Sequence, residues 1–341
     1  MKKSFLLIGI FVWIAVIVAA VFIMGSIING QYSIPNYSVL LKEEEIALSG
    51  ISEISIETGS LDIEFVSSTS QQLKALQYGN ENTAAEQQFS ITQNSGRIKI
   101  SVKRLTKAFN INFGIKERLV LEIPDKWLGN VDVQNTSGNI CLLDSFTWKR
   151  VNLSCSSGDM LIMETFDTEE TTMQLTSGNI IAYQGLSVAE KLSIASSSGD
   201  IRLQGTLQAR SLFAKSTSGN IVIERANVEK YNLHTSSGNI QVTGLSGGGK
   251  ASASSGNIKL NLVAPVGNVE MDTSSGDIRL AVDADISFSF IGRCTSGDIH
   301  ANFPIKKNDR GNKAEASIGD DPAIFIRAEA SSGNIVIEQL M

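Results

Sequence analysis

The sequence predicts an all-β protein: a single-stranded β-helix, or β-solenoid, of ~20-residue coils that follows one N-terminal transmembrane helix. Three observations support this fold class. The motif Ser/Thr-Ser-Gly-Asn/Asp-Ile begins at residue 136 and returns at intervals of 18 to 21 residues as far as Gly297, with one more copy around Gly333. Polar and apolar residues alternate on both sides of each copy, and a charge-free apolar run lies near the start of the chain. A steady period of this length is the signature of stacked supersecondary units.

The apolar run extends from Phe5 to Ile28 and follows Lys2 and Lys3. As a helix with a rise of ~1.5 Å per residue it would reach roughly 35 Å, which is enough to cross a hydrocarbon core of about 30 Å. The lysines before it and the mildly acidic chain after it predict that the N-terminus lies in the cytoplasm and the rest of the chain outside.

A cleavable signal peptide is the alternative, because Val18-Ala19-Ala20 is small enough for a peptidase site. Apolar residues continue through Val21-Phe22-Ile23-Met24, which favours an uncleaved signal-anchor at residues 1–28. Residues 29–45 are then expected to form a stalk that holds the folded part away from the bilayer. We therefore expect a single-pass protein of the cell membrane with an extracellular C-terminal domain.

The strand pattern becomes clear when the repeats are aligned on their glycines. Leu153 and Val151 stand five and seven residues before Gly158, and Met160 and Ile162 stand two and four residues after it. Polar residues lie between them, so each repeat is expected to carry two half-buried strands, one on each side of the motif. A propeller is the alternative, but its blades take about 40–45 residues, roughly twice this period.

The expected solenoid covers residues 46–341. Its parts are the cap and opening coils at 46–130, regular repeats at 131–303, a loop insertion at 304–322 and a closing coil at 323–341. Uncovered coils at the two ends would leave strand edges open to end-to-end association.

The motif has the residue types that a corner between two strands requires. Glycine adopts φ > 0 without a Cβ penalty, and Asn or Asp tolerates a left-handed backbone while bonding to its own backbone. Because stacked strands lie about 4.8 Å apart, equivalent residues are expected to form ladders of Ser hydroxyls and Asn amides, with the Ile after each corner inside. The expected corner ladder consists of Gly138, Asn139, Gly158, Asp159, Gly178, Asn179, Gly199, Asp200, Gly219, Asn220, Gly238, Asn239, Gly256, Asn257, Gly276, Asp277, Gly297, Asp298, Gly333 and Asn334.

Charge and composition exclude several classes of function. The formal net charge of −6 over 341 residues argues against nucleic-acid binding, because phosphates favour a basic face. The chain has only 2 histidines and 3 cysteines. Cys141, Cys155 and Cys294 have neither a CxxC nor a zinc spacing and fit small apolar fillers of the strands.

A calcium site is also disfavoured, because calcium needs several charged oxygens that converge on one point. The fourth position of the motif mixes Asp with Asn, and only Asp277 and Asp298 are expected in consecutive coils. We therefore expect neither a metal nor a cofactor.

The best candidate for a ligand-binding patch lies on the two coils that precede the loop insertion. Asp272 and Arg293 share one outward position of the repeat, and Arg279 and His300 share another. Such a patch could hold an anionic sugar or a carboxylate, or it could be a surface ladder of opposite charges. In a polysaccharide-degrading β-helix it would have to supply an acid, a base and charge-stabilising partners.

Further motifs outside the corners are Ser49–Ile54 leading into Glu57–Ile63, then Leu121–Asp125, and Ser317–Asp320 near the end. Together with the corners they make the chain resemble the bacterial putative-adhesin family of β-strand-repeat domains, whose function is unknown, over residues 46–341. The resemblance implies a β-strand-repeat fold, often tethered by one N-terminal helix. It supplies no catalytic residues.

These observations predict a non-catalytic extracellular module of the cell surface, which binds like an adhesin or acts as an envelope scaffold. Its partners would be the membrane it spans and an envelope protein or cell-wall glycan. One alternative is a sensor or regulator of envelope stress that acts through a membrane partner. The second is a polysaccharide-active β-helix enzyme.

Overall fold

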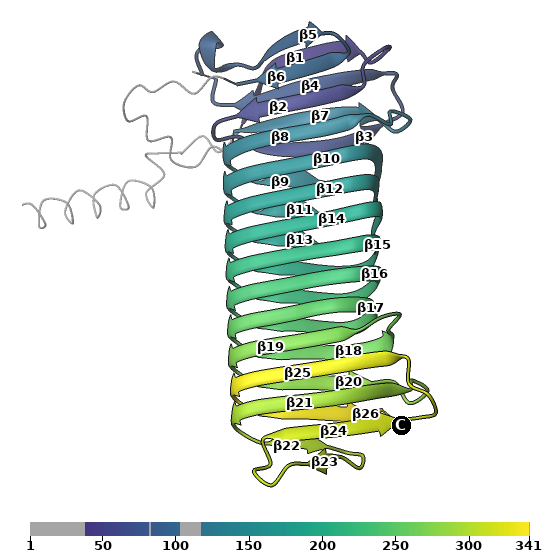
Figure 1. The fold of residues 1–341 in the computed structure, drawn as a ribbon. Helices are drawn as coiled ribbons and strands as arrows, with labels where there is room; N and C mark the ends of the chain where they lie inside the picture. The colour runs from purple at the N-terminus through teal and green to yellow at the C-terminus, as the bar shows by residue number, and fades with distance from the viewer. Residues whose placement is uncertain (1–37, 82, 103–116, 341) are drawn as a thin grey trace, which may run out of the picture.

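The computed structural model describes residues 38–81, 83–102 and 117–340, which form one tall stack of β-strands (Figure 1). The expected all-β solenoid is confirmed, and the one helical turn in these ranges is the 3-10 turn η1 (Ala85–Gln87). The transmembrane helix expected at 1–28 lies outside the described residues. Among those residues, no helix is long and apolar enough to cross a membrane.

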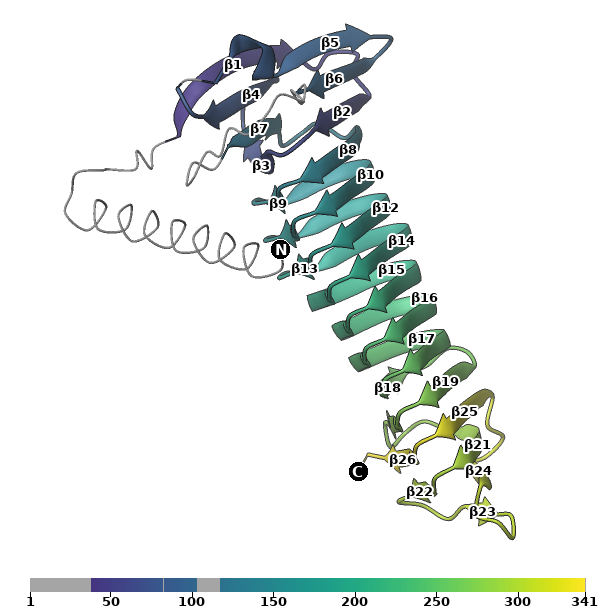
Figure 2. The same cartoon turned by 90° about the vertical axis from the view of Figure 1, so that its left-hand side faces the viewer.

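Each regular coil has a long segment that leads to the glycine corner and a short segment after it, on the opposite side of the stack (Figure 2). Successive coils pair in parallel and in register, so that Met173 faces Leu153 on one side and Ile194 on the other. The strands of this part are β8 (Asn130–Ser137), β9 (Ile140–Leu142), β10 (Phe146–Ser157), β11 (Met160–Ile162), β12 (Phe166–Ser177), β13 (Ile180–Ala182), β14 (Leu186–Ser198), β15 (Ile201–Ser218), β16 (Ile221–Ser237), β17 (Ile240–Ser255), β18 (Ile258–Ala264), β19 (Val269–Ser275) and β20 (Ile278–Val282). The short segment is a strand of its own in β9, β11 and β13, and it runs on into the next long segment in β15, β16 and β17.

The long strands bend in the middle. The sequence predicted two half-buried strands for each repeat but not this bend. In β10 the buried side chains are Phe146 and Trp148, then Val151, Leu153 and Cys155. The alternation changes phase between these two groups, where two consecutive residues are exposed. Each coil therefore presents three inward-facing segments to the core, and apolar side chains from all three fill it.

The corners are joined by a continuous hydrogen-bond ladder. The backbone N–H of each corner Asn or Asp donates to the Oδ1 atom of the equivalent residue in the neighbouring coil, with distances of 2.7 to 3.0 Å. This satisfies a backbone donor that the turn leaves without a strand partner. The ladder runs from Asp62 through the motif residues to Asp298.

Removing one rung should destabilise the fold modestly. Asn179 Oδ1 accepts from the Asp200 N–H at 3.0 Å, and Asn179→Ala leaves that donor without its acceptor. We expect the free energy of unfolding to fall by about 1 kcal/mol, measured by urea denaturation. Asn232→Ala, at an exposed position in the middle of β16, is the matched control and should change it by less than about 0.5 kcal/mol. Equal losses in both variants would show that the ladder bond contributes nothing.

Residues 323–341 were expected to form the closing coil at the end of the stack. They form a coil inside the stack instead. β25 (Ile324–Ser332) pairs in parallel with β19 on one side and with β21 (Phe288–Ser296) on the other. β26 (Ile335–Gln339) likewise lies between β20 and β22 (Ile299–Ala301). Figure 1 shows the yellow β25 between the green β19 and β21. The coils of Gly276 and Gly297, expected to be neighbours, are therefore separated by the coil of Gly333.

The segment expected as a loop insertion at 304–322 contains a hairpin of β23 (Lys306–Lys307) and β24 (Lys313–Ile318). β24 pairs antiparallel with β21 and covers its outer edge. This explains the position of the last coil, because β25 finds only the inner edge of β21 free.

At the N-terminal end, too, the order of the strands in space differs from their order in the sequence. β2 (Glu53–Thr58) lies between β6 (Arg97–Ser101) and β8, and β3 (Asp62–Ser68) pairs with β7 (Arg118–Pro124) and β9. Antiparallel strands cover the outermost edges, with β4 (Gln72–Gly79) on β7 and β5 (Ser90–Asn94) on β6. The outer parallel edges of β6, β7 and β21 are thus covered by antiparallel strands.

The stalk was expected to extend from residue 29 to residue 45, but the folded part of the chain already begins at Val39. Residues 39–45 belong to β1 (Val39–Ala47), which pairs antiparallel with β4. Its sequence Lys42-Glu43-Glu44-Glu45 is highly charged. Charged residues are typical of edge strands that must not pair with another chain, which is why this segment resembles a solvated stalk in the sequence.

Candidate binding trough

Three hollows lie in one line along the stack, on the long-strand side next to the glycine corners. The first is lined by Glu57, Thr58 and Thr136, among others. The second is lined by residues just before the corners of successive coils, from Ser154 to Thr217. The third is lined mainly by the equivalent residues of later coils, from His234 to Ser331. Because the coils stack in register, the three hollows use the same positions of the repeat in neighbouring coils. We call this line of three hollows the trough.

Two positions of the repeat build the trough. The floor column stands two residues before each corner glycine, and the wall column stands four residues before it. The floor column is Thr136, Ser156, Thr176, Ser197, Thr217, Ser236, Ser254, Ser274, Ser331 and Thr295, in spatial order. The wall column is Gln134, Ser154, Gln174, Ala195, Lys215, His234, Ser252, Asp272, Glu329 and Arg293.

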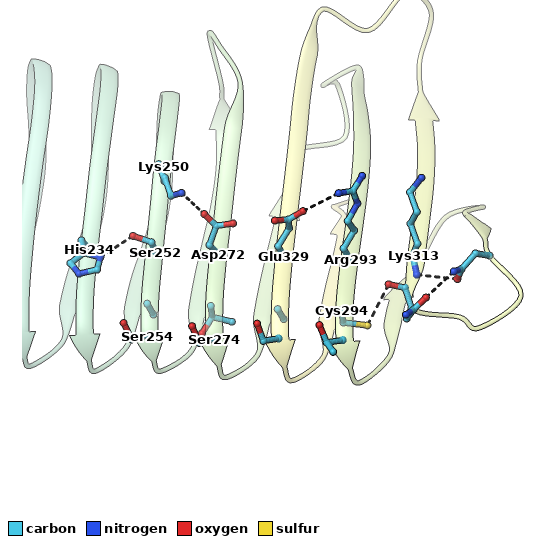
Figure 3. A pocket seen from close by; sticks show the side chains of 17 residues that line it. His234, Lys250, Ser252, Ser254, Asp272, Ser274, Arg293, Cys294, Lys313 and Glu329 are labelled. Carbon is cyan, nitrogen blue, oxygen red and sulfur yellow. Dashed lines mark hydrogen bonds and ion pairs between the residues drawn. The ribbon is translucent and has the colours of Figure 1, made fainter.

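The third hollow, of about 730 Å³, lies at the C-terminal end of the trough. Figure 3 shows its wall side chains on successive strands, with Ser254 and Ser274 closer to the corners. Asn308 and Asn312 of the β23–β24 hairpin line its end, and the Asn308 Nδ2 donates to the Asn312 Oδ1 at 2.8 Å.

The charges along this part of the wall are paired with one another. Lys250 forms an ion pair with Asp272, and the Arg293 Nη1 lies 3.6 Å from the Glu329 Oε1. Arg327, on the neighbouring outward position of β25, donates to the same Glu329 oxygen at 2.8 Å. Exposed pairs of this kind contribute less than about 1 kcal/mol each to stability. Lys313, which also lines the hollow, forms an ion pair with Glu315, whose carboxylate lies 2.6 Å away. Each cation that lines the hollow is therefore paired with a carboxylate.

His234 is the one wall residue whose pKa the surroundings lower. Partial burial comes first, and the nearby ammonium groups of Lys215 and Lys250 add to it. The His234 Nδ1 lies 2.9 Å from the Ser252 Oγ. The neutral ring is therefore favoured between the Lys215 ammonium on one side and the Ser252 hydroxyl on the other.

The structure separates the four residues of the predicted patch. Asp272 and Arg293 line the third hollow, but Glu329 lies between them. Arg279 and His300 lie on β20 and β22, beyond the glycine corner, so they face a different side of the stack, with Val336 between them. The patch is wrong as a single site because the corner turns the chain between the two halves of each coil.

The sequence missed Lys250, Glu329 and Lys313 as neighbours of Asp272 and Arg293. Alignment of the Gly333 repeat with the others places Glu329 at the same repeat position as Asp272. No sequence signal shows that this repeat inserts between two earlier coils.

Within the ranges that the structure describes, no group of three or more His, Cys, Asp or Glu residues could hold a metal ion. Asp277 and Asp298, expected in consecutive coils, are separated by Asn334, whose backbone N–H donates to Asp277 and whose Oδ1 accepts from the N–H of Asp298. The ladder alternates here between carboxylate and amide groups.

The cysteines do not contribute an exposed reactive group to the trough. Cys155 and Cys294 are buried fillers of the long strands, as predicted, and burial raises the pKa of both thiols. Cys141 is half-buried, because it points outward from the short strand β9 and not into the core.

Comparisons with known proteins concern the whole stack. A family model described as Toastrack DUF4097 matches the chain twice, over residues 51–206 and 163–338. A crystal structure described as a "putative adhesin" from Parabacteroides merdae is 14% identical, has a TM-score of 0.43, and the match covers 88% of this chain and 96% of that chain. A "putative lipid binding protein" from Parabacteroides distasonis is 17% identical with a TM-score of 0.42, at 88% and 96% coverage. A "putative adhesin" from Bacteroides fragilis is 12% identical with a TM-score of 0.39, again at 88% and 96%. No curated protein matches the chain.

Proposed function

The chain belongs to the Toastrack DUF4097 family, and on this premise we propose that it is a non-catalytic, adhesin-like binding or scaffold module of the bacterial cell surface. The observation that supports this most is the trough, whose floor and wall columns continue from coil to coil along the stack. Its floor column alone extends roughly 45 Å at ~4.8 Å per strand. A long, repetitive surface offers many equivalent weak contacts to one extended partner.

The distribution of charge fits binding better than catalysis. Catalytic acids and bases are usually set apart by strongly perturbed pKa values in a convergent pocket. Here the polar groups are spread along a line, and the ionised side chains of the third hollow are held in exposed ion pairs.

The apolar run Phe5–Ile28 supplies the tether in this proposal. As an uncleaved signal-anchor it would leave the N-terminus in the cytoplasm and place the solenoid outside the membrane. A short segment from residue 29 to the start of β1 would then join the anchor to the stack. The trough would face the envelope, where cell-wall glycans and envelope proteins are within reach.

The test is retention of envelope components by the immobilised full-length chain. We expect a specific glycan or protein fraction to be retained by the natural chain. A variant with Lys250→Gln, Asp272→Asn, Glu329→Gln and Arg293→Gln should lose at least about tenfold in retention, because it removes four ionised groups that line the third hollow. Circular dichroism checks that the variant is folded, since exposed ion pairs contribute little to stability.

The matched control neutralises Arg279 and His300, which belong to the same predicted patch but face another side of the stack. Arg279→Gln with His300→Gln should retain as much as the natural chain. If nothing is retained by the natural chain, the binding proposal fails. If both variants lose retention equally, the trough is not the binding surface.

A further inference from the structure

The floor column and the motif serines next to it carry hydroxyl groups that are free to bind a ligand. In the described parts of the chain, none of these side-chain hydroxyls has a hydrogen-bond partner in the protein, and nearly all are exposed. Ser196, only 4% exposed, lines the second hollow, and its Oγ also lacks a partner. The trough therefore presents free donors and acceptors at every coil, about 4.8 Å apart.

The backbone of the trough does not favour a peptide strand. The long strands are hydrogen-bonded to a neighbour on both sides, from β8 to β21. A peptide cannot add to a sheet that has no free edge at this place. Recognition in the trough must therefore use side chains.

The charges of the wall do not favour a polyanion. Lys250 and Arg293 are already paired with Asp272 and Glu329. Lys313, the third cation of the hollow, is paired with Glu315. These carboxylates would repel an anionic chain. The natural chain carries a formal net charge of −6, which adds to that repulsion.

We propose that the trough binds a neutral, linear glycan lengthwise, with its long axis along the stack. This inference rests on the proposed function and names its ligand class. Sugar hydroxyls both donate and accept, so they can pair with the free hydroxyls of the floor at each coil. In the third hollow, Asp272 and Glu329 accept from sugar hydroxyls, while Arg293 and Lys250 donate to them.

The hairpin gives the trough a closed end. Asn308 and Asn312 line the C-terminal end of the third hollow, where their amides can contact a terminal sugar. Toward the N-terminal end, the wall column carries the amides of Gln134 and Gln174. The contacts at each coil are weak, so affinity should rise with the number of coils that one glycan covers.

The test is titration calorimetry of the full-length chain with neutral oligomers of N-acetylglucosamine and of glucose, as dimers, tetramers and hexamers. Oligogalacturonates of the same lengths serve as anionic counterparts. At least one neutral hexamer should bind about tenfold or more tightly than its dimer, because it spans more coils. Its affinity should change little with salt, since no net charge is neutralised, and the anionic hexamer should bind more weakly.

A floor variant locates the site with little change of bulk: Ser254→Ala, Ser274→Ala, Ser331→Ala and Thr295→Val. It removes free hydroxyls that have no partner in the protein, so the fold should be unchanged, and hexamer affinity should fall about tenfold or more.

The control is Thr147→Val with Ser187→Ala, two outward hydroxyls on the first segment of the long strands that likewise have no partner in the protein, and its affinity should be unchanged.

Several results would overturn the inference. These are equal affinity for dimer and hexamer, tighter binding of the anionic series, an equal loss in the floor variant and its control, or no binding of any neutral oligomer. If envelope fractions are retained by the chain while no neutral oligomer binds, this inference fails and the proposed function stands. If neither is bound, both fail.

Discussion

Gly199→Ala is expected to lower the free energy of unfolding by about 3 to 5 kcal/mol, the range of the most severe single substitutions. Two causes act together. The backbone of Gly199 has φ = 137°, a conformation that side chains with a Cβ rarely adopt. A Cβ built there would also stand 1.9 Å from the carbonyl oxygen of Gly178 in the neighbouring coil. Neither atom can move without breaking the register of the stack. Guanidinium denaturation followed by circular dichroism measures the loss.

Two controls separate the causes. Gly50→Ala, at φ = 73° with nothing within 4 Å of the added Cβ, carries the backbone strain alone and should cost about 1 to 2 kcal/mol. Ser198→Ala, next to Gly199 but exposed, should change stability by less than about 0.5 kcal/mol. A loss at Gly199 no larger than at Gly50 would show that close stacking of the corners is not what requires glycine.

The regular part of the fold could be predicted from the sequence because each repeat carries the same local information. The glycine fixes the corner, Asn or Asp supplies the ladder acceptor, and residues such as Ile180 and Ile201 mark the inside. All of these follow from turn chemistry and from alternation within one repeat.

The order of the coils could not be predicted, because it is a property of pairing between equivalent motifs. The corner at Gly333 carries the same signal as the corner at Gly297, so the sequence does not say which of them faces Gly276. The choice is made by β24, which occupies the outer edge of β21. β24 itself, in a polar segment of the sequence, looks like a loop.

The candidate site was half predicted for the same reason. Asp272 and Arg293 were correctly placed on an outward position next to the corner, but their true neighbour Glu329 comes from the inserted coil. Arg279 and His300 were included because they share another outward position of the repeat. In the fold, that corner puts them on another side of the stack.

The second large effect is an all-or-none difference between two engineered cysteine pairs. Asp272→Cys with Glu329→Cys places thiols on directly paired strands, about 4.8 Å apart at Cα, within the range of a disulfide. Asp272→Cys with Arg293→Cys places them two strands apart, at about 10 Å, beyond that range. Under mild oxidation we expect the first pair to cross-link almost completely and the second not at all. Glu329→Cys with Arg293→Cys is the positive control, because these residues are neighbours in either order of the coils.

Peptide mapping of these cysteine pairs by mass spectrometry tests the account most directly, because the third hollow of the trough exists only if β25 lies between β19 and β21. The account predicts a disulfide between positions 272 and 329 and none between positions 272 and 293. The reverse pattern would show that the coils stack in sequence order. The wall of Asp272, Glu329 and Arg293, and the binding surface built on it, would then be wrong.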